Sequence, residues 1–214
     1  MNSNNSSSRS TESGPLKFNN GIENMLADHV IISAEKDNPE SVIASVDKFC
    51  WNNHWMMHVG DKKGEIVDNA LIKYKPKIIL ELGTYCGYSA IRMAKFLPDC
   101  GMLYTIDPYP TDCAARLIDY SGLNDKIITI RGFAADVIPS LTDLKGKVDL
   151  VFIDHDKKAY LPDLMLIEKY GLLHPDSVIV ADNVIIFKIN DYLDHVRNSK
   201  LYSSSVNYLS TLEY

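Results

Sequence analysis

Polar residues directly follow two apolar runs in the second half of the chain. Asp154 comes after the run 150–153, and Asp182 and Asn183 come after the run 178–181. Two carboxylates and an amide oxygen on neighbouring strand ends would form a hard, all-oxygen site, which suits Mg²⁺ better than Ca²⁺ or Zn²⁺. Each aspartate could instead cap the helix that follows it, but their joint placement beside Asn183 favours a metal.

A lysine lies close to the first of these acids in the sequence. Lys157 comes three residues after Asp154, at the start of the next expected helix, where its amine could reach a substrate held at the metal. A lysine is a poor base at its ordinary pKa of about 10.4, but a nearby dication and partial burial both lower such a value. Lys157 is therefore a candidate general base, whereas its neighbour Lys158 is expected to be a solvated surface charge.

A glycine-containing turn follows the first apolar run. Gly83 and Gly87 allow a tight turn that lets the backbone approach a ligand. The spacing is not the Gly-x-Gly-x-x-Gly of dinucleotide binders, and Glu81 would repel a pyrophosphate. Asp107 ends the next run, where it can accept hydrogen bonds from both ribose hydroxyls. S-adenosylmethionine therefore fits better than NAD, although a purely structural turn with a capping acid is the alternative.

The elements that must position these groups are short apolar runs alternating with helical stretches from Pro76 onward. Continuous β-branched runs of this kind are typical of a parallel sheet covered on both faces. The pattern predicts an α/β fold, a Rossmann-like doubly wound and mostly parallel sheet, whose strand carboxyl ends meet at one rim. Strands are expected over residues 78–80, 102–106, 127–130, 150–153 and 178–181.

Further elements flank this sheet. Asn38 can cap a helix whose first turn takes Pro39, and we expect the ordered chain to begin there. A second helix is expected over residues 62–74 and another over residues 190–198. Residues 201–212 are expected to form an edge strand.

Composition limits the class of protein. The 214 residues are 46% hydrophobic and 23% charged, enough for one well-buried core. We expect one domain over residues 21–214, after a polar tail, residues 1–20, with too little apolar content to fold. The net charge of −6, without a basic cluster, disfavours a nucleic-acid partner. No apolar run has membrane-spanning length and no secretory signal is present, so we expect a cytoplasmic protein.

The cysteines give a further indication of the protein's chemistry. They lie far apart and form no C-x-x-C pair, so neither a zinc knuckle nor a dense disulfide framework is indicated. We interpret all four as reduced thiols. They are Cys50, Cys86, Cys100 and Cys113.

Several motifs, taken together and in order, resemble the catechol O-methyltransferase family. The resemblance runs from about residue 38 to residue 214. The motifs that carry it are WMMHVGDKKG (55–64), LELGTYCGYSA (80–90), VFIDH (151–155), YLPD (160–163) and ADNV (181–184).

The resemblance implies Mg²⁺-dependent transfer of a methyl group from S-adenosylmethionine to one hydroxyl of a catechol. By this analogy Asp154, Asp182 and Asn183 hold the metal and Lys157 is the general base. The implied substrate-binding residues are Trp55, Lys157, Asn183 and Glu213, although Trp55 could equally be an aromatic residue packed between helices. The implied cofactor-binding residues are Met57, Val59, Glu81, Gly83, Tyr85, Ser89, Asp107, Ala134, Asp154 and His155. The expected partner is a small-molecule catechol, bound by a monomer.

Four positions depart from the family pattern, and they bear on cofactor affinity and acceptor shape. His58 stands where the mammalian enzymes have Asn, Ala135 where they have Gln, Asp156 where they have Trp, and Phe187 where they have Pro. The family also continues into a last strand beyond Tyr214, and without that strand we expect an exposed sheet edge.

Other functions compatible with these residues are methylation of another vicinal diphenol and a non-catalytic paralogue that binds S-adenosylmethionine. A nucleotide-dependent oxidoreductase is opposed by the missing phosphate-binding glycine spacing.

Overall fold

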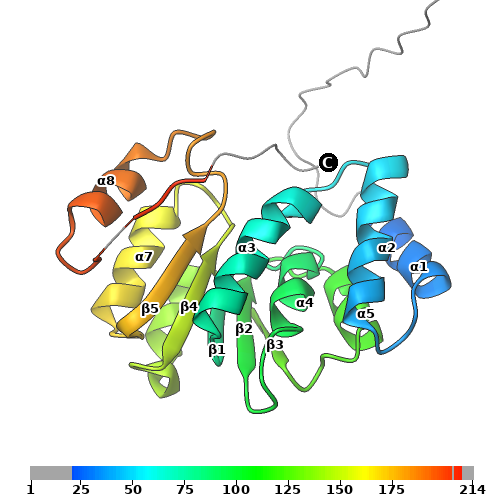
Figure 1. Ribbon diagram of the computed structural model, residues 1–214, viewed down its shortest axis with the longest axis horizontal. Coiled ribbons are helices and arrows are strands. Elements are labelled where there is room, and N and C mark those ends of the chain that lie inside the picture. Colours follow the sequence, from blue (N-terminus) through cyan, green and yellow to red (C-terminus); the bar gives the residue numbers. More distant parts are fainter. Residues whose placement is uncertain (1–20, 204, 209–214) are drawn as a thin grey trace, which may run out of the picture.

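The computed structural model describes residues 21–203 and 205–208 and shows one sheet with helices on both faces (Figure 1). The expected tail over residues 1–20 and the position Glu213 lie outside these residues. The helices are α1 (Ile22–Ser33), α2 (Pro39–Asn52), α3 (Gly60–Tyr74), α4 (Tyr88–Ala94), α5 (Asp112–Tyr120), α6 (Ala134–Val137), α7 (Tyr160–Lys169) and α8 (Asn190–Asn198), with 3₁₀ turns η1 (Ile138–Ser140) and η2 (Thr142–Leu144). The strands are β1 (Ile78–Leu82), β2 (Met102–Asp107), β3 (Ile127–Arg131), β4 (Val148–Ile153) and β5 (Leu173–Ala181).

The sheet is parallel in every pairing of its order β3-β2-β1-β4-β5. The chain switches direction across the sheet between β1 and β4, which is where ligands bind in open α/β sheets, at the carboxyl ends of the strands. Ile153 pairs with Ala181, so the residues that follow them, Asp154 and Asp182, emerge side by side. The predicted doubly wound fold is confirmed.

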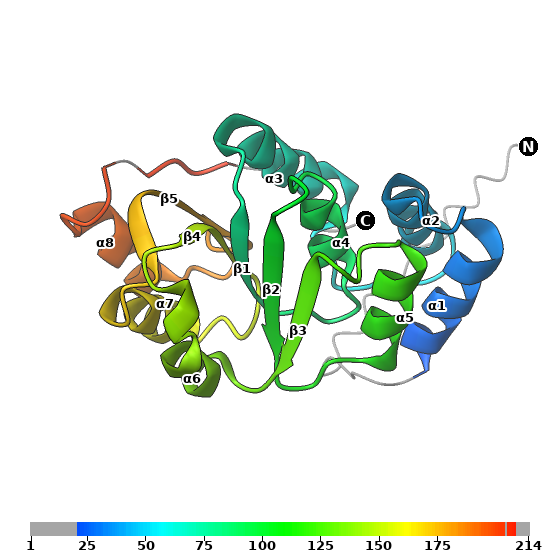
Figure 2. The same ribbon diagram turned by 90° about the horizontal axis from the view of Figure 1, so that it is seen from below.

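Two apolar cores lie on the two faces of the sheet. One joins the sheet to α1, α2, α3, α4 and α5, and the other joins it to α6, α7 and α8. Figures 1 and 2 show these two groups of helices on opposite sides of the strands. Alternation along β1 serves both cores, because Ile79 belongs to the first and Leu80 and Leu82 to the second. Central strands buried on both faces hold the carboxyl-end rim in place.

The three helices expected by residue range are present as α2, α3 and α8, and one helix, α1, was missed. The side chain of Asn38 accepts a hydrogen bond from the Ser41 backbone N–H at 3.1 Å, and Pro39 is the first residue of α2. The expectation that order begins at this helix is wrong, because α1 precedes it and buries Leu26 and Val30. Its N-cap, Gly21, makes no side-chain capping bond, so the usual start signal is missing.

Strand β5 is longer than its apolar run predicts. It begins at Leu173 and includes His174, Pro175 and Asp176, residues that are uncommon within strands. A register shift between Val148 and Leu150 accompanies this irregular stretch. The imidazole of His174 pairs with Asp149 at 3.0 Å, so polar contacts replace apolar packing at the amino end of these strands.

The predicted edge strand over residues 201–212 is wrong for the residues that can be judged. Residues 201–203 and 205–208 contain no strand, and the remaining positions lie outside the described chain. Leu201 and Val206 are 70% and 69% exposed. Alternation predicts a half-buried strand only where a neighbour pairs with it, and these side chains cover no core.

Candidate functional site

The turn between β1 and α4, residues 83–87, depends on glycine. Gly83 has a φ of 103°, and a Cβ placed there would lie 2.4 Å from the carbonyl oxygen of Asp154. Gly87 has a φ of 81°. The predicted tight turn can therefore lie directly against the end of β4 only because residue 83 has no side chain.

Asp107 at the end of β2 holds this turn in shape. Its Oδ2 accepts hydrogen bonds from the backbone N–H groups of Thr84 and Tyr85, both at 3.0 Å. Its Oδ1 accepts from the N–H of Tyr109 at 2.7 Å. The structure places Asp107 beside the turn as predicted, and its contact with a ribose stays a prediction.

A pocket opens between the turn, the end of β4 and the segment before α3. It brings together six of the ten predicted cofactor-binding residues; Glu81, Asp107, Ala134 and His155 are not among its lining residues. Ala134 packs in the core with α7 and α8, and His155 Nε2 contacts Asp163 Oδ2 at 2.7 Å. The residues that line the pocket are Met57, His58, Val59, Gly83, Thr84, Tyr85, Cys86, Tyr88, Ser89 and Asp154.

His58, one of the departures from the family pattern, is a wall of this pocket. Its ring stands edge-on to Tyr85 at 5.5 Å and to Tyr88 at 5.2 Å between ring centroids. It is buried, with 4% of its surface exposed. The imidazole therefore replaces the smaller family residue by filling space between two aromatic rings.

Glu81 is a completely buried acid beside the pocket. Neither of its carboxyl oxygens has a hydrogen-bond partner of normal geometry among the described residues. Burial raises the pKa of Glu81 to about 8; the nearby Ser89 and Thr105 hydroxyls oppose this shift only in part. A buried carboxyl in this state is costly unless a cation or donor joins it, which fits the ammonium group of an amino-acid ligand.

The acids at the ends of β4 and β5 are each paired with a lysine. Lys63 of α3 donates a hydrogen bond to Asp182 Oδ2 at 2.6 Å, and Lys157 donates to Asp154 Oδ1 at 2.7 Å. The first pair is nearly buried, with side-chain exposures of 11% and 8%. Two ammonium groups thus balance two carboxylates. Sequence reasoning missed Lys63, because a lysine in a charged helical stretch looks like a surface residue.

The donor chemistry of the predicted metal set fits Mg²⁺. Asn183 has a φ of 61°, a left-handed conformation that Asn tolerates, and its N–H donates to Asp182 Oδ1 at 2.7 Å. Within residues 21–203 and 205–208, no group of three or more His, Cys, Asp or Glu side chains is arranged to hold a metal. The set here has two carboxylates and one amide, all oxygen donors that suit Mg²⁺, and its metal stays a prediction.

Tyr160 joins the two lysine-paired acids and was not among the predicted site residues. Its hydroxyl accepts a hydrogen bond from Lys157 Nζ at 2.7 Å and donates one to the backbone carbonyl of Asp182 at 3.1 Å. Its ring is fully buried and stacks on His155 at 5.3 Å, with 8° between the planes. Lys157 was expected at the start of this helix, but α7 begins only at Tyr160. The separation of three residues from Lys157 was the signal that could have found Tyr160.

Exposed aromatic side chains lie beside Lys157 and beyond Asp107. Trp55 is 49% exposed, so it is not packed between helices. Its role in binding the substrate stays a prediction. Phe187 places its ring 5.8 Å from Lys157 Nζ. Beyond Asp107, the exposed rings of Tyr109 and Phe133 meet edge-on at 6.1 Å.

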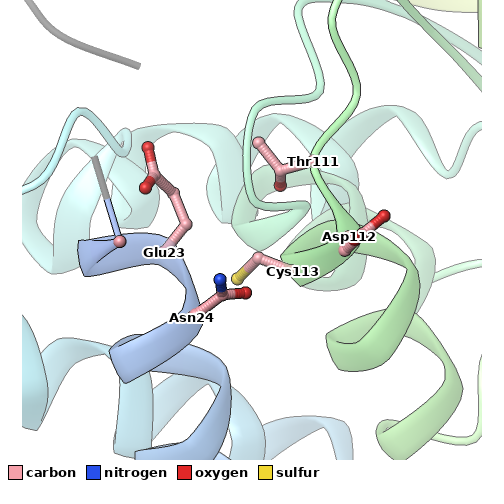
Figure 3. A pocket seen from close by; sticks show the side chains of 6 residues that line it. Glu23, Asn24, Thr111, Asp112 and Cys113 are labelled. Atoms are coloured by element: carbon pink, nitrogen blue, oxygen red, sulfur yellow. The ribbon is translucent and has the colours of Figure 1, made fainter. Parts of the chain in front are cut away.

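A second, small pocket lies between α1 and the start of α5. It is lined by Glu23 and Asn24 of α1 and by Thr111, Asp112 and Cys113, and Figure 3 shows the Cys113 side chain pointing toward Asn24. Its link to the site is Tyr85, whose hydroxyl donates to Glu23 Oε1 at 3.4 Å. None of its lining residues is a predicted site residue. All four cysteines are free, in agreement with the prediction of reduced thiols.

Comparison with known proteins agrees with this geometry. The family model described as O-methyltransferase matches residues 32–200. Catechol O-methyltransferase of Bos taurus is 41% identical over 93% of this chain and 74% of its own length. Catechol O-methyltransferase B of Danio rerio is 43% identical over 85% of this chain and 70% of its own length.

A solved structure shares the fold. The O-methyltransferase TomG from Streptomyces achromogenes, described in complex with SAM, has a TM-score of 0.64 and 23% identity, with coverage of 85% of this chain and 86% of that chain. No helix in the described part of this chain is both long and apolar enough to cross a membrane.

Proposed function

The chain belongs to the catechol O-methyltransferase family of O-methyltransferases, and on that basis we propose that it transfers a methyl group from S-adenosylmethionine to one hydroxyl of a catechol. The observation that carries the proposal is the position of Asp154. It lines the pocket beside the glycine turn and also pairs with Lys157. A donor in the pocket and an acceptor at the paired acids would therefore meet at one residue.

The pocket side suits the methyl donor. Glu81, buried and without a hydrogen bond of normal geometry among the described residues, would face the ammonium group. Asp107 has lone pairs left for the ribose hydroxyls after accepting its three backbone bonds. The exposed rings of Tyr109 and Phe133 lie beside Asp107, where an adenine could stack on them.

The acid side suits a diol acceptor and Mg²⁺. Asp154, Asp182 and Asn183 would hold the metal, which when bound would lower the pKa of the reacting hydroxyl and fix both acceptor oxygens. Trp55 and Phe187 would enclose the acceptor ring. The attacking oxygen forms its bond to the methyl carbon as the carbon–sulfur bond breaks, and Lys157 takes the hydroxyl proton. Most of the catalytic effect then comes from alignment, because an in-line displacement needs little covalent help.

An assay of the full chain tests this proposal. With S-adenosylmethionine, Mg²⁺ and catechol, dopamine or caffeic acid as acceptor, we expect methylated product that EDTA suppresses. Lys157→Met should lower kcat by about 10²- to 10⁴-fold, the usual contribution of one positioned base. Binding of S-adenosylhomocysteine, measured by calorimetry, should be nearly unchanged in that variant.

The other outcomes identify the alternatives. Activity toward caffeic acid alone would indicate a different vicinal diphenol as substrate. Binding of S-adenosylhomocysteine without methylation of any acceptor would indicate a non-catalytic binding protein. Full activity of Lys157→Met would remove Lys157 from the mechanism.

A further inference from the structure

We propose that Tyr160 is a positioning residue that orients the amine of Lys157 toward the acceptor hydroxyl. This inference rests on the proposed function, in which Lys157 takes the proton. It concerns a residue that contacts neither substrate nor metal in that proposal and acts through its bond to Lys157.

The direction of each hydrogen bond in this group is fixed by chemistry. A carbonyl oxygen can only accept, so the single hydroxyl hydrogen of Tyr160 goes to the backbone oxygen of Asp182, at 3.1 Å. The phenolic oxygen is then left as an acceptor. It can bind Lys157 Nζ, at 2.7 Å, only by receiving a hydrogen from the amine.

This polarity determines where the lone pair of Lys157 points. Lys157 can act as a base only after its ammonium group has given one proton to solvent, and the resulting neutral amine has two N–H bonds and one lone pair in tetrahedral directions. Asp154 Oδ1 and Tyr160 Oη, both 2.7 Å from Nζ, accept the two hydrogens. The lone pair takes a remaining direction, where it can receive the acceptor proton: the O–H bond breaks, an N–H bond forms, and neither earlier contact changes.

Tyr160 is well held for this purpose. Its side chain is fully buried between the stacked ring of His155 and the edge of Tyr192, whose centroid is 5.9 Å away. These ring contacts hold the phenol where it donates its one hydrogen to the Asp182 carbonyl and accepts one from Lys157.

The test compares two acceptors in two variants. Tyr160→Phe should lower kcat for catechol by about 10- to 100-fold, part of what a positioned base supplies, with KM for both substrates and the Kd for S-adenosylhomocysteine within about twofold. With 4-nitrocatechol, whose hydroxyl is already ionised at neutral pH, the base has little to do. The defects of Tyr160→Phe and Lys157→Met should therefore both shrink.

Tyr192→Phe is the matched control. It removes a hydroxyl from the buried tyrosine that packs against Tyr160, and this tyrosine has no role in the proposed chemistry. We expect wild-type kcat for both acceptors. The double variant Lys157→Met with Tyr160→Phe should be no slower than Lys157→Met alone, since Tyr160 acts through the amine.

The outcomes separate this inference from the proposed function. Turnover of catechol by Lys157→Met at the wild-type rate would overturn the assignment of the base itself. A Lys157→Met variant that is inactive, together with a fully active Tyr160→Phe, would overturn only the role of Tyr160. Equal losses with catechol and 4-nitrocatechol would show a structural role and would also overturn it.

A second replacement covers the case in which Tyr160→Phe does not fold. 3-Fluorotyrosine incorporated at position 160 keeps the shape and both hydrogen bonds but weakens the oxygen as an acceptor. We expect a smaller loss of kcat with catechol and none with 4-nitrocatechol. An unchanged kcat for catechol would overturn the inference.

Discussion

The acidic side chains on the two sides of the site have different kinds of partner. On the pocket side, Asp107 accepts hydrogen bonds from backbone N–H groups, and Glu81 has only the nearby Ser89 and Thr105 hydroxyls, neither at normal hydrogen-bond geometry. On the other side, Asp154 and Asp182 are each paired with a lysine. The pocket side is thus shaped by backbone hydrogen bonds and holds a buried carboxyl whose raised pKa keeps it protonated near pH 7, whereas the acid side is balanced in charge before any ligand binds.

This difference indicates what each side requires from its ligands. A cationic group entering beside Glu81 would relieve a desolvated carboxyl, so ligand binding and proton release should be coupled there. A cation approaching Asp182 meets an existing ammonium group 2.6 Å from Oδ2. Binding there must compete with Lys63. Replacing Lys63 should therefore favour cation binding on the acid side, whereas replacing Glu81 should weaken ligand binding on the pocket side.

The largest expected effect on stability and ligand binding comes from a substitution that disturbs the backbone turn of the pocket side. Gly83→Ala would place a methyl group 2.4 Å from the Asp154 carbonyl oxygen, at a φ of 103°. Strain and overlap together should lower the free energy of unfolding by about 4 kcal/mol and abolish binding of S-adenosylhomocysteine. Urea denaturation and calorimetric titration measure the two effects.

Gly146→Ala is the matched control for the strained conformation. Gly146 also has a positive φ, of 66°, but a Cβ there would meet nothing within 4 Å. This variant should lose only about 1 kcal/mol and bind S-adenosylhomocysteine normally. If Gly83→Ala were no worse than this control, the close approach of the turn to β4 would not matter.

The next largest effect is expected from a substitution that removes one positive charge from the acid side. Lys63→Met leaves Asp182 nearly buried without its ammonium partner, which should cost about 3 kcal/mol of stability. Added Mg²⁺ should restore more stability to the variant than to the wild type, because the competing cation is gone. Thermal unfolding with and without MgCl₂ measures both effects.

The neighbouring lysine provides the control. Lys62 pairs with Glu65 at 3.7 Å, and both side chains are more than 60% exposed, so Lys62→Met should change stability by less than about 0.5 kcal/mol. An Mg²⁺ response in Lys63→Met equal to that of the wild type would show that Lys63 and the metal do not compete for Asp182.

Much of this fold follows from the sequence because its signals are local and repeated. Five apolar runs locate the five strands, and Asn38 with Pro39 marks the start of α2. The strand ends then place Asp107, Asp154 and Asp182 on one rim, since carboxyl ends of parallel strands share an edge. Sequence patterns predict edge strands less well than central strands, and the expected last strand is absent from residues 201–203 and 205–208.

The contacts that determine the chemistry could not be predicted in the same way. Lys63 and Asp182 are 119 residues apart, and nothing in a charged helical stretch distinguishes a buried lysine from an exposed one. The bond of Tyr160 to the Asp182 carbonyl joins α7 to the end of β5, which only the packed structure reveals. Long-range pairing, rather than residue type, separates these residues from their neighbours.

The smallest expected effect concerns the pH dependence of the pocket side. The pKa of Glu81 is raised from 4.5 to about 8 in the folded protein. Between these values the folded chain holds a proton that the unfolded chain has lost, so this group lowers stability progressively as pH rises through the window. Glu81→Gln has no such proton, so its stability relative to wild type should increase from pH 5 to pH 8 and then level off.

Ligand binding should make Glu81 release its proton, and this release can be measured. An ammonium group beside Glu81 favours the carboxylate, so wild type at pH 7 should release close to one proton when S-adenosylhomocysteine binds, whereas Glu81→Gln should release none and bind about tenfold more weakly. Calorimetry in buffers of different ionisation enthalpy counts the protons. Glu65→Gln, on the exposed face of α3, should behave as wild type. Equal proton release in wild type and Glu81→Gln would show that the ligand charge lies elsewhere, and the contrast between the two sides of the site would then rest on the lysine-paired acids alone.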